Sequence, residues 1–114
     1  MPKDNILRKQ KDFDFVYKKG KYSASKFLVI MYCKNRMRES RYAFVASKKV
    51  GNSVSRNRAR RLMKESYRLS GLEFPEGYDY IFVARKGIED ASLKEVQKSL
   101  VSAYRRIVRK KQNK

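Results

Sequence analysis

Few residues of this sequence could act as a catalytic acid, base or nucleophile. The chain has no histidine, which is the commonest general base and metal ligand in proteins. The closest pairs among its 11 acidic residues, Asp12 with Asp14 and Glu89 with Asp90, would not face each other on a helix. A two-metal nuclease gathers several carboxylates around one cleft, and no spacing here indicates such a group. The single cysteine, Cys33, lies in an apolar run typical of a core position. We therefore predict no catalytic residue and no metal-ligand set on this protein.

The chemistry that the sequence does offer is cationic. Lys and Arg total 30 against 11 Asp and Glu, which gives a net charge of 30 − 11 = +19. Self-repulsion at this charge destabilises the compact state unless a polyanion is usually bound. The composition therefore favours nucleic acid as the partner over an anionic membrane surface or another polyanion. The sequence shows no secretion signal and no apolar run of membrane-spanning length, so we expect a cytoplasmic protein with no membrane partner.

One segment concentrates the positive charge on a single helix face. A helical projection of residues 55–70 puts small and apolar side chains on the side that would face the core: Ala59, Leu62, Met63, Ser66 and Leu69. The opposite side carries Arg56, Asn57, Arg60, Arg61, Lys64 and Arg68, with Arg58 and Glu65 at the border. Arginine side chains and the free N–H groups of a helix N-terminus both bind phosphate, and Lys48 and Lys49 precede the same end of the helix. The pattern predicts a phosphate-binding surface; the alternative is a helix face that is merely solvated.

Two aromatic residues, Phe13 and Tyr17, stand four positions apart on another predicted helix. Single-stranded nucleic acid commonly lies in a charged groove with aromatic rings on which its bases stack. The two rings therefore either line such a groove or seat the helix on the sheet.

These residues belong to a single predicted domain, 1–114, that ends in a flexible basic tail at 109–114. The predicted elements are a helix from Asp12 to Gly20, strands at 26–33 and 41–48, a helix at 55–70, a strand at 78–85 and a last helix from Ser92. Polar residues 35–40 predict an antiparallel hairpin between the first two strands. Ser92 and Glu95 fit a capping box. With a short extra strand near 22–25, the order α-β-β-(β)-α-β-α predicts an α+β fold, a small and mainly antiparallel sheet covered by helices.

Residues 47–62 carry a specific resemblance. The run Ser-Lys-Lys-Val-Gly-Asn-Ser-Val at 47–54, followed by Arg-Asn-Arg-Ala-Arg-Arg-Leu at 56–62, closely resembles the signature of the bacterial ribonuclease P protein component. The hallmark of that family is an RNR-type basic helix after an SKK-x-G-N-x-V turn. Residues 12–20 are similar to the first helix of the family, and 78–85 resemble the strand before its last helix. The resemblance therefore extends over nearly the whole chain.

This resemblance implies a small basic subunit of a holoenzyme that removes the 5′ leader from precursor tRNA by Mg²⁺-dependent hydrolysis, with Mg²⁺ bound mainly by the RNA subunit and the substrate. It implies that the catalytic RNA contacts the basic helix and the turn before it, at Lys48, Lys49, Arg56, Asn57, Arg58, Arg60, Arg61, Lys64 and Arg68. The leader would enter a cleft between the first helix and the sheet, on Phe13, Tyr17 and either Met31 or Tyr32. The family fold is an α-β sandwich with a left-handed β-α-β crossover. The alternative function is that of a ribosomal or other structural RNA-binding protein without a processing role.

Overall fold

The computed structural model describes residues 5–112, with side chains for residues 5–109. Its elements are α1 (Gln10–Lys19), β1 (Lys21–Ala24), β2 (Leu28–Lys34), β3 (Arg41–Val45), α2 (Ser53–Ser70), β4 (Tyr78–Ala84), the short 3₁₀ helix η2 (Ile88–Asp90) and α3 (Leu93–Gln112). The four strands form one sheet in the order β1-β2-β4-β3. The predicted α+β class and the element order are confirmed, with the short strand β1 present between α1 and β2.

The predicted hairpin between the second and third strands is wrong. β4 lies between them, antiparallel to β2 and parallel to β3. The central position suits β4 because four consecutive residues of it, 79–82, are buried, as expected for a strand covered on both faces. The chain after β2 crosses the start of β4 instead of making a tight turn: the Asn35 amide donates to the Gly77 carbonyl at 2.8 Å, and the Tyr78 amide donates to Ser40 Oγ at 3.3 Å.

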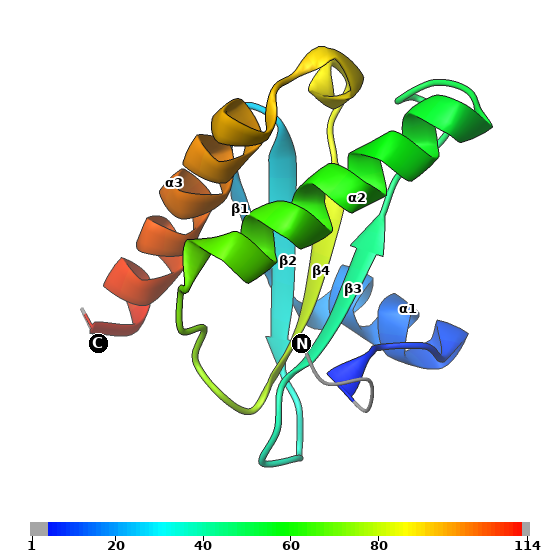
Figure 1. Ribbon diagram of the computed structural model, residues 1–114. Helices are drawn as coiled ribbons and strands as arrows, with labels where there is room; N and C mark the ends of the chain where they lie inside the picture. The colour runs from blue at the N-terminus through cyan, green and yellow to red at the C-terminus, as the bar shows by residue number, and fades with distance from the viewer. Residues whose placement is uncertain (1–4, 113–114) are drawn as a thin grey trace.

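The connection from β3 through α2 to β4 is left-handed. In Figure 1 both strands run upward and α2 lies in front of the sheet, yet β4 lies to the left of β3. Nearly all parallel crossovers are right-handed, because a right-twisted strand feeding a right-handed helix packs back onto the sheet that way. The fold that the family resemblance implies therefore includes a feature that hydrophobic periodicity could not predict.

The sheet divides the core into two layers. On one face, α2 and α3 cover the larger cluster, which includes Leu28, Ile30, Tyr80 and Phe82. On the other face, α1 covers a smaller cluster centred on Leu7, Val16, Ala43 and Ile81. Figure 1 shows the consequence: two long helices cross the front of the sheet, whereas α1 lies behind its lower half only. Part of the α1 face of the sheet therefore stays open.

The basic helix α2 begins two residues earlier than predicted. Asn52 is its N-cap, and its side-chain oxygen accepts a hydrogen bond from the Ser55 amide at 3.0 Å. Gly71 ends the helix in the left-handed conformation, with φ of 66°. Leu69, predicted on the core side, is 48% exposed because it lies in the last turn, beyond the sheet-covering part of the helix.

The last helix begins with the predicted capping box. The Ser92 amide donates to Glu95 Oε1 at 2.8 Å, and the Glu95 amide donates to Ser92 Oγ at 3.2 Å. The helix continues to Gln112, so 109–112 of the predicted flexible tail are helical, and 113–114 lie outside the described residues.

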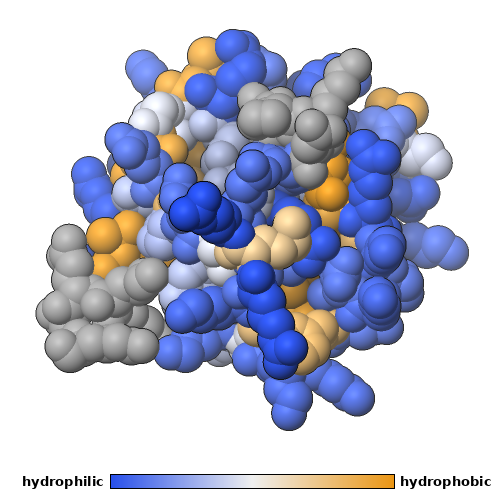
Figure 2. Space-filling view, turned by 90° about the horizontal axis from the view of Figure 1, so that it is seen from below, coloured by the Kyte–Doolittle hydropathy of each residue, from blue (hydrophilic) through white to orange (hydrophobic). Residues whose placement is uncertain are grey.

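Hydrophilic residues cover most of the lower end of the molecule, and hydrophobic ones form small separate patches there (Figure 2). No helix within residues 5–112 is long and apolar enough to cross a membrane.

Candidate nucleic-acid interface

The exposed side of α2 carries most of the cations that the sequence places there, whereas Arg56 and Arg60 are half-buried and Arg60 Nη2 donates to Asn57 Oδ1. Asn57, Arg61, Lys64 and Arg68 are exposed, whereas Ala59, Met63 and Ser66 on the opposite side are buried. Its first turn holds no acidic residue to offset the positive end of the helix dipole. The only acidic residue of α2, Glu65, pairs with Arg68 at 2.7 Å, and this hydrogen-bonded pairing lowers the pKa of Glu65. The helix face as a whole thus stays strongly positive.

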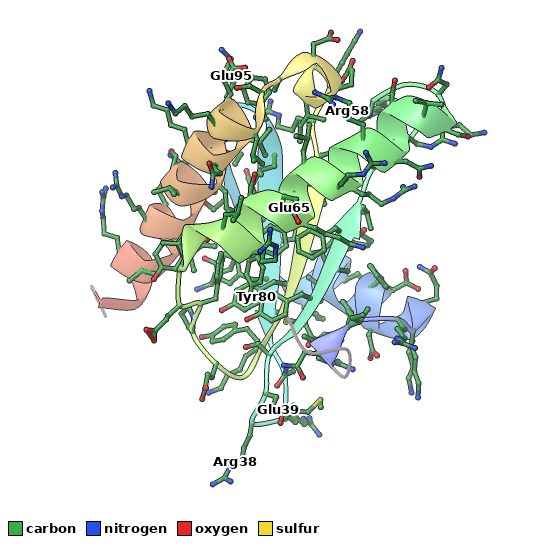
Figure 3. All side chains as sticks on the ribbon, viewed as in Figure 1. Arg38, Glu39, Arg58, Glu65, Tyr80 and Glu95 are labelled. Carbon is green, nitrogen blue, oxygen red and sulfur yellow. The ribbon has the colours of Figure 1, made fainter. Side chains whose placement is uncertain are left out.

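Two arginines of this helix are held by the protein's own backbone. Arg56 folds back over the N-terminus, where Nη1 donates to the Gly51 carbonyl at 3.0 Å. Arg58 reaches across to η2, where Nε donates to the Glu89 carbonyl at 2.9 Å and Nη2 to the Ala91 carbonyl at 3.4 Å. Figure 3 shows Arg58 at the upper end of α2, directed toward that turn. Sequence reasoning assigned Arg58 to RNA alone and missed this structural role, because both acceptors are more than 30 positions away along the chain.

Four other cations of this surface make no such contact with the backbone of the described residues. For Arg61, Lys64, Lys48 and Lys49, no side-chain hydrogen bond or ion pair is found within the described part of the chain, and all four are exposed. Lys48 and Lys49 sit in a turn that closes when the Gly51 amide donates to the Lys48 carbonyl at 3.1 Å. Gly51 has φ of 143°, and a Cβ there would lie 2.9 Å from the Ser55 Cβ, so the turn requires glycine. The turn places both lysines beside the start of α2.

The residues predicted to hold the leader, Phe13, Tyr17 and Met31, lie on the other face of the sheet, and we call this surface the aromatic cleft. Phe13 and Tyr17 flank the buried Val16 on α1, with ring centroids 6.4 Å apart and planes tilted by 40°. Tyr17 is 45% exposed, and partial burial together with Asp14 raises the pKa of its hydroxyl, which therefore stays neutral. Phe13 packs on the same apolar cluster as the half-buried Met31 of β2. Met31 and the cluster form the floor of this surface, and the Phe13 and Tyr17 rings form its side, so bases could stack there.

Of the two sequence candidates on β2, only Met31 lies in this cleft. Tyr32 is the next residue along the strand, so it points to the opposite face, where it is 5% exposed and packs against Tyr78 and Tyr80. Assigning Tyr32 to the cleft is therefore wrong on geometric grounds.

Two contacts that the sequence did not reveal fix the position of α1. At its C-terminal end, a Cβ on Gly20 would lie 2.5 Å from the Val16 carbonyl oxygen and 2.7 Å from that of Tyr32, so only glycine allows this close approach. At its N-terminal end, Arg41 Nη1 donates to Asp12 Oδ2 at 3.3 Å.

Arg41 in turn is anchored on the sheet. Its Nε and Nη2 donate to the two carboxylate oxygens of the nearly buried Asp79 at 2.9 and 2.7 Å. Hydrogen bonding to Asp79, followed by its charge and that of Asp12, raises the pKa of Arg41. A bidentate pair of this kind fixes direction as well as distance. The helix that bears the aromatic rings is thus tied to the sheet at both ends.

Phe13 of the aromatic cleft and Lys64 of the basic helix line one hollow at the β3 edge of the sheet. A hollow of about 210 Å³ there is lined by Phe13 of α1, Phe44 and Val45 of β3, and Lys64 of α2. Residues far apart in the sequence thus bring an aromatic ring and a cation to one surface depression. This contiguity lets one nucleic-acid strand, or two adjoining ones, contact both features.

Within residues 5–112, no three His, Cys, Asp or Glu side chains come together as a metal site. Figure 3 shows Glu39, Glu65 and Glu95 on different elements, well separated from one another. Cys33 is half-buried, and burial together with the Asp79 charge raises the pKa of its thiol, which disfavours the reactive thiolate.

Comparison with known proteins adds an independent line of evidence. The family model described as Ribonuclease P matches residues 1–108. The "Ribonuclease P protein component" of Clostridium botulinum (strain Loch Maree / Type A3) is 42% identical over 105 residues, covering 91% of this chain and 95% of that protein. The one from Alkaliphilus oremlandii (strain OhILAs) is 46% identical over 103 residues, covering 90% of each. Among solved structures, the Staphylococcus aureus RNase P protein superposes with a TM-score of 0.76 at 30% identity, covering 87% of this chain and 91% of that one. The Thermotoga maritima RNase P protein gives 0.76 at 28% identity, covering 89% and 96%.

Proposed function

Because this chain belongs to the ribonuclease P protein family, we propose that it binds the catalytic RNA of that ribonuclease and the 5′ leader of precursor tRNA at the same time. Family membership makes it the protein component of a ribonuclease holoenzyme that acts in tRNA 5′ processing. The observation that carries the finer proposal is the hollow shared by Phe13 and Lys64, which joins the aromatic cleft to the basic helix.

The exposed cations of α2 and the preceding turn would bind phosphates of the catalytic RNA. Arg61, Lys64, Lys48 and Lys49 are free to do so, whereas Arg58 would contribute mainly by holding η2 against α2. Each phosphate that a cation neutralises releases condensed counterions, so binding would weaken steeply as salt concentration rises.

The cleft of Phe13, Tyr17 and Met31 would hold unpaired leader bases by stacking. Stacking on aromatic rings tolerates any base, because every base has a π-face. A leader held here would be fixed in register beside the RNA-bound helix, since the two features share one hollow.

We propose that the bond is cleaved on the RNA, with Mg²⁺ held there and by the substrate. Mg²⁺ supplies charge neutralisation and an activated water for phosphodiester hydrolysis. Placing Mg²⁺ mainly on the RNA and the substrate is supported by the described residues, among which no three His, Cys, Asp or Glu side chains come together. The protein would act by offsetting the repulsion between two polyanions and by positioning the leader.

A reconstitution assay tests this function. The protein is combined with a ribonuclease P RNA, and single-turnover cleavage of precursor tRNA is measured at low and high Mg²⁺. We expect acceleration by the protein, largest at low Mg²⁺ because high Mg²⁺ replaces part of the screening. Holoenzymes with single Asp→Asn or Glu→Gln changes should cleave nearly as fast as the unmodified one, except at Asp12 and Asp79, whose contacts with Arg41 hold α1 on the sheet.

Two results would overturn the proposal. A protein that binds the RNA without accelerating cleavage at any Mg²⁺ concentration would be a structural RNA-binding protein. A folded, RNA-bound carboxylate variant that loses on the order of 10³-fold at both concentrations would place catalytic chemistry on the protein, since general acid–base groups contribute about 10²–10⁴-fold.

A further inference from the structure

The aromatic cleft does not end at Met31. Tyr22 of β1 pairs in register with Met31, and residues directly opposite on antiparallel strands have their side chains on the same face of the sheet. Tyr22 therefore lies on the α1 face, one strand beyond the cleft floor. It is 65% exposed, more than Tyr17 at 45% or Phe15 at 55%. A base leaving the cleft toward β1 would meet this ring next.

Tyr22 also lines a hollow that turns around the edge of the sheet. The hollow has a volume of about 520 Å³, and its lining includes Lys21, Ser23, Tyr32 and Arg106. Tyr22 and Tyr32 point to opposite faces, so the residues around the hollow come from both faces of the β1 edge and, with Arg106, from α3. Its only charged lining residues within the described part of the chain are cations, Lys21 and Arg106.

Arg106 is held in place across this edge. Its Nε donates to Ser23 Oγ at 3.3 Å, its Nη1 to Ser102 Oγ at 3.4 Å, and its Nη2 to the Ala24 carbonyl. A guanidinium has five N–H donors. Three are used in these described contacts, which leaves two that could bind a phosphate oxygen without a change of side-chain conformation.

The contact between Arg106 and the Ala24 carbonyl also determines which kind of partner the β1 edge can bind. A protein strand that added to β1 would need the outward-facing backbone groups of this edge strand. Arg106 already occupies the Ala24 carbonyl, so strand addition is obstructed there. An exposed ring beside two cations suits unpaired RNA instead.

We propose that the leader path extends beyond the α1 cleft, over Tyr22 and into the hollow at the β1 edge, where Lys21 and Arg106 bind phosphates of upstream nucleotides. This inference rests on the proposed function, because it continues the same strand of RNA. It makes the affinity for precursor tRNA depend on leader length. Figure 1 shows β1 and α3 along one side of the molecule, away from the β3 edge, so this extension is separate from the start of α2.

Leader length provides the test. The reconstituted holoenzyme is titrated with mature tRNA and with precursors whose leaders are about 4 or about 12 nucleotides long, within the span that single-strand-binding grooves cover. Tyr22→Ala should weaken binding of the long-leader precursor by about 5- to 150-fold, the equivalent of one lost stacked base. The short-leader precursor should bind as before. Tyr22→Phe should restore binding, since it keeps the ring.

A matched pair of arginines tests the electrostatic part. Arg106→Ala should weaken long-leader binding and flatten its salt dependence, whereas Arg105→Ala, the exposed neighbour outside the hollow, should do neither. Thermal unfolding of both variants identifies any loss that comes from misfolding, and Tyr22→Ala, on an exposed side chain, decides the matter if Arg106→Ala fails to fold.

The outcomes separate this extension from the function on which it rests. If the unmodified holoenzyme binds both precursors no better than mature tRNA, the leader cleft itself is refuted. If Phe13→Ala abolishes the short-leader gain but Tyr22→Ala binds the long leader normally, only the extension is refuted.

Discussion

Substitution of Arg58 should distinguish a residue that stabilises the fold from the neighbouring residues that bind RNA. Its guanidinium donates to two backbone carbonyls of the η2 segment, at 2.9 and 3.4 Å. A hydrogen bond to a charged group contributes about 1.5–3 kcal/mol to stability. Arg58 is exposed and its second bond is long, so solvent screening reduces the expected total for Arg58→Ala to about 1–2 kcal/mol of unfolding free energy. For a domain of this size, each kcal/mol shifts the melting temperature by about 3–6 °C.

The assay is urea or thermal unfolding of the free protein, followed by circular dichroism, with Arg61→Ala as the matched control. Arg61 is also exposed and has no side-chain partner in the described part of the chain, so its loss should cost less than about 0.5 kcal/mol. In RNA binding, Arg61→Ala should have the larger effect, because it should reduce the slope of log K against log salt by about 0.9. Arg58→Lys keeps the charge, so it should retain that slope while the free energy of unfolding falls. The reasoning is refuted if Arg58→Ala unfolds like the unmodified protein and changes the salt slope as Arg61→Ala does.

Three more expectations follow from the geometry. Phe13→Ala and Tyr17→Ala should cost about 1–3 kcal/mol in binding precursor tRNA and nothing for mature tRNA; equal losses for both RNAs in a titration would make these rings mere packing residues. Gly20→Ala should cost about 1–3 kcal/mol of stability and displace α1, abolishing leader discrimination while leaving RNA-subunit binding intact, and a normal unfolding curve would contradict this. Burial raises the pKa of the fully buried Tyr80, whose hydroxyl donates to the Pro75 carbonyl at 2.6 Å, so its contribution to stability is present below pH 10 and is lost as the pH rises above it. Tyr80→Phe should therefore reduce the slope of unfolding free energy against pH above 10 by about 1.4 kcal/mol per pH unit, measured by urea unfolding at each pH.

Local signals in the sequence predicted most of the elements but not how they pair. The capping box at Ser92 and the apolar side of α2 are set by neighbours within one or two helical turns, so they could be found in the sequence. Strand pairing depends on distant segments, and the short polar stretch 35–40 favoured a hairpin that the structure lacks. The sequence signal for the central position of β4 was the continuous apolar run at 80–84, because strands buried on both faces lack the alternation of apolar and polar residues.

The candidate site, like the fold, was predictable where it depends on neighbouring residues and not where it depends on distant segments. The exposure of most α2 cations was predictable from helical periodicity, and the contact between the Phe13 and Tyr17 rings was predictable from their spacing. The choice between Met31 and Tyr32 was not, because a shift of one residue reverses the face and alternation alone does not say which face is open. The role of Arg58 was also hidden, since its carbonyl acceptors belong to a turn whose position depends on the whole fold.

The central position of β4 has a consequence for how this protein folds. β4 is the last strand of the described residues, yet both β2 and β3 pair with it. Ile30 of β2 pairs with Phe82, 82 − 30 = 52 positions later, and Tyr42 of β3 pairs with Tyr80. Until residues 78–84 are inserted, β2 and β3 present unpaired edges, which are templates for aggregation. Folding through such distant pairings is slow compared with hairpin formation. The net charge of +19 then acts before any RNA is bound, because it makes partly folded chains repel one another until the sheet closes.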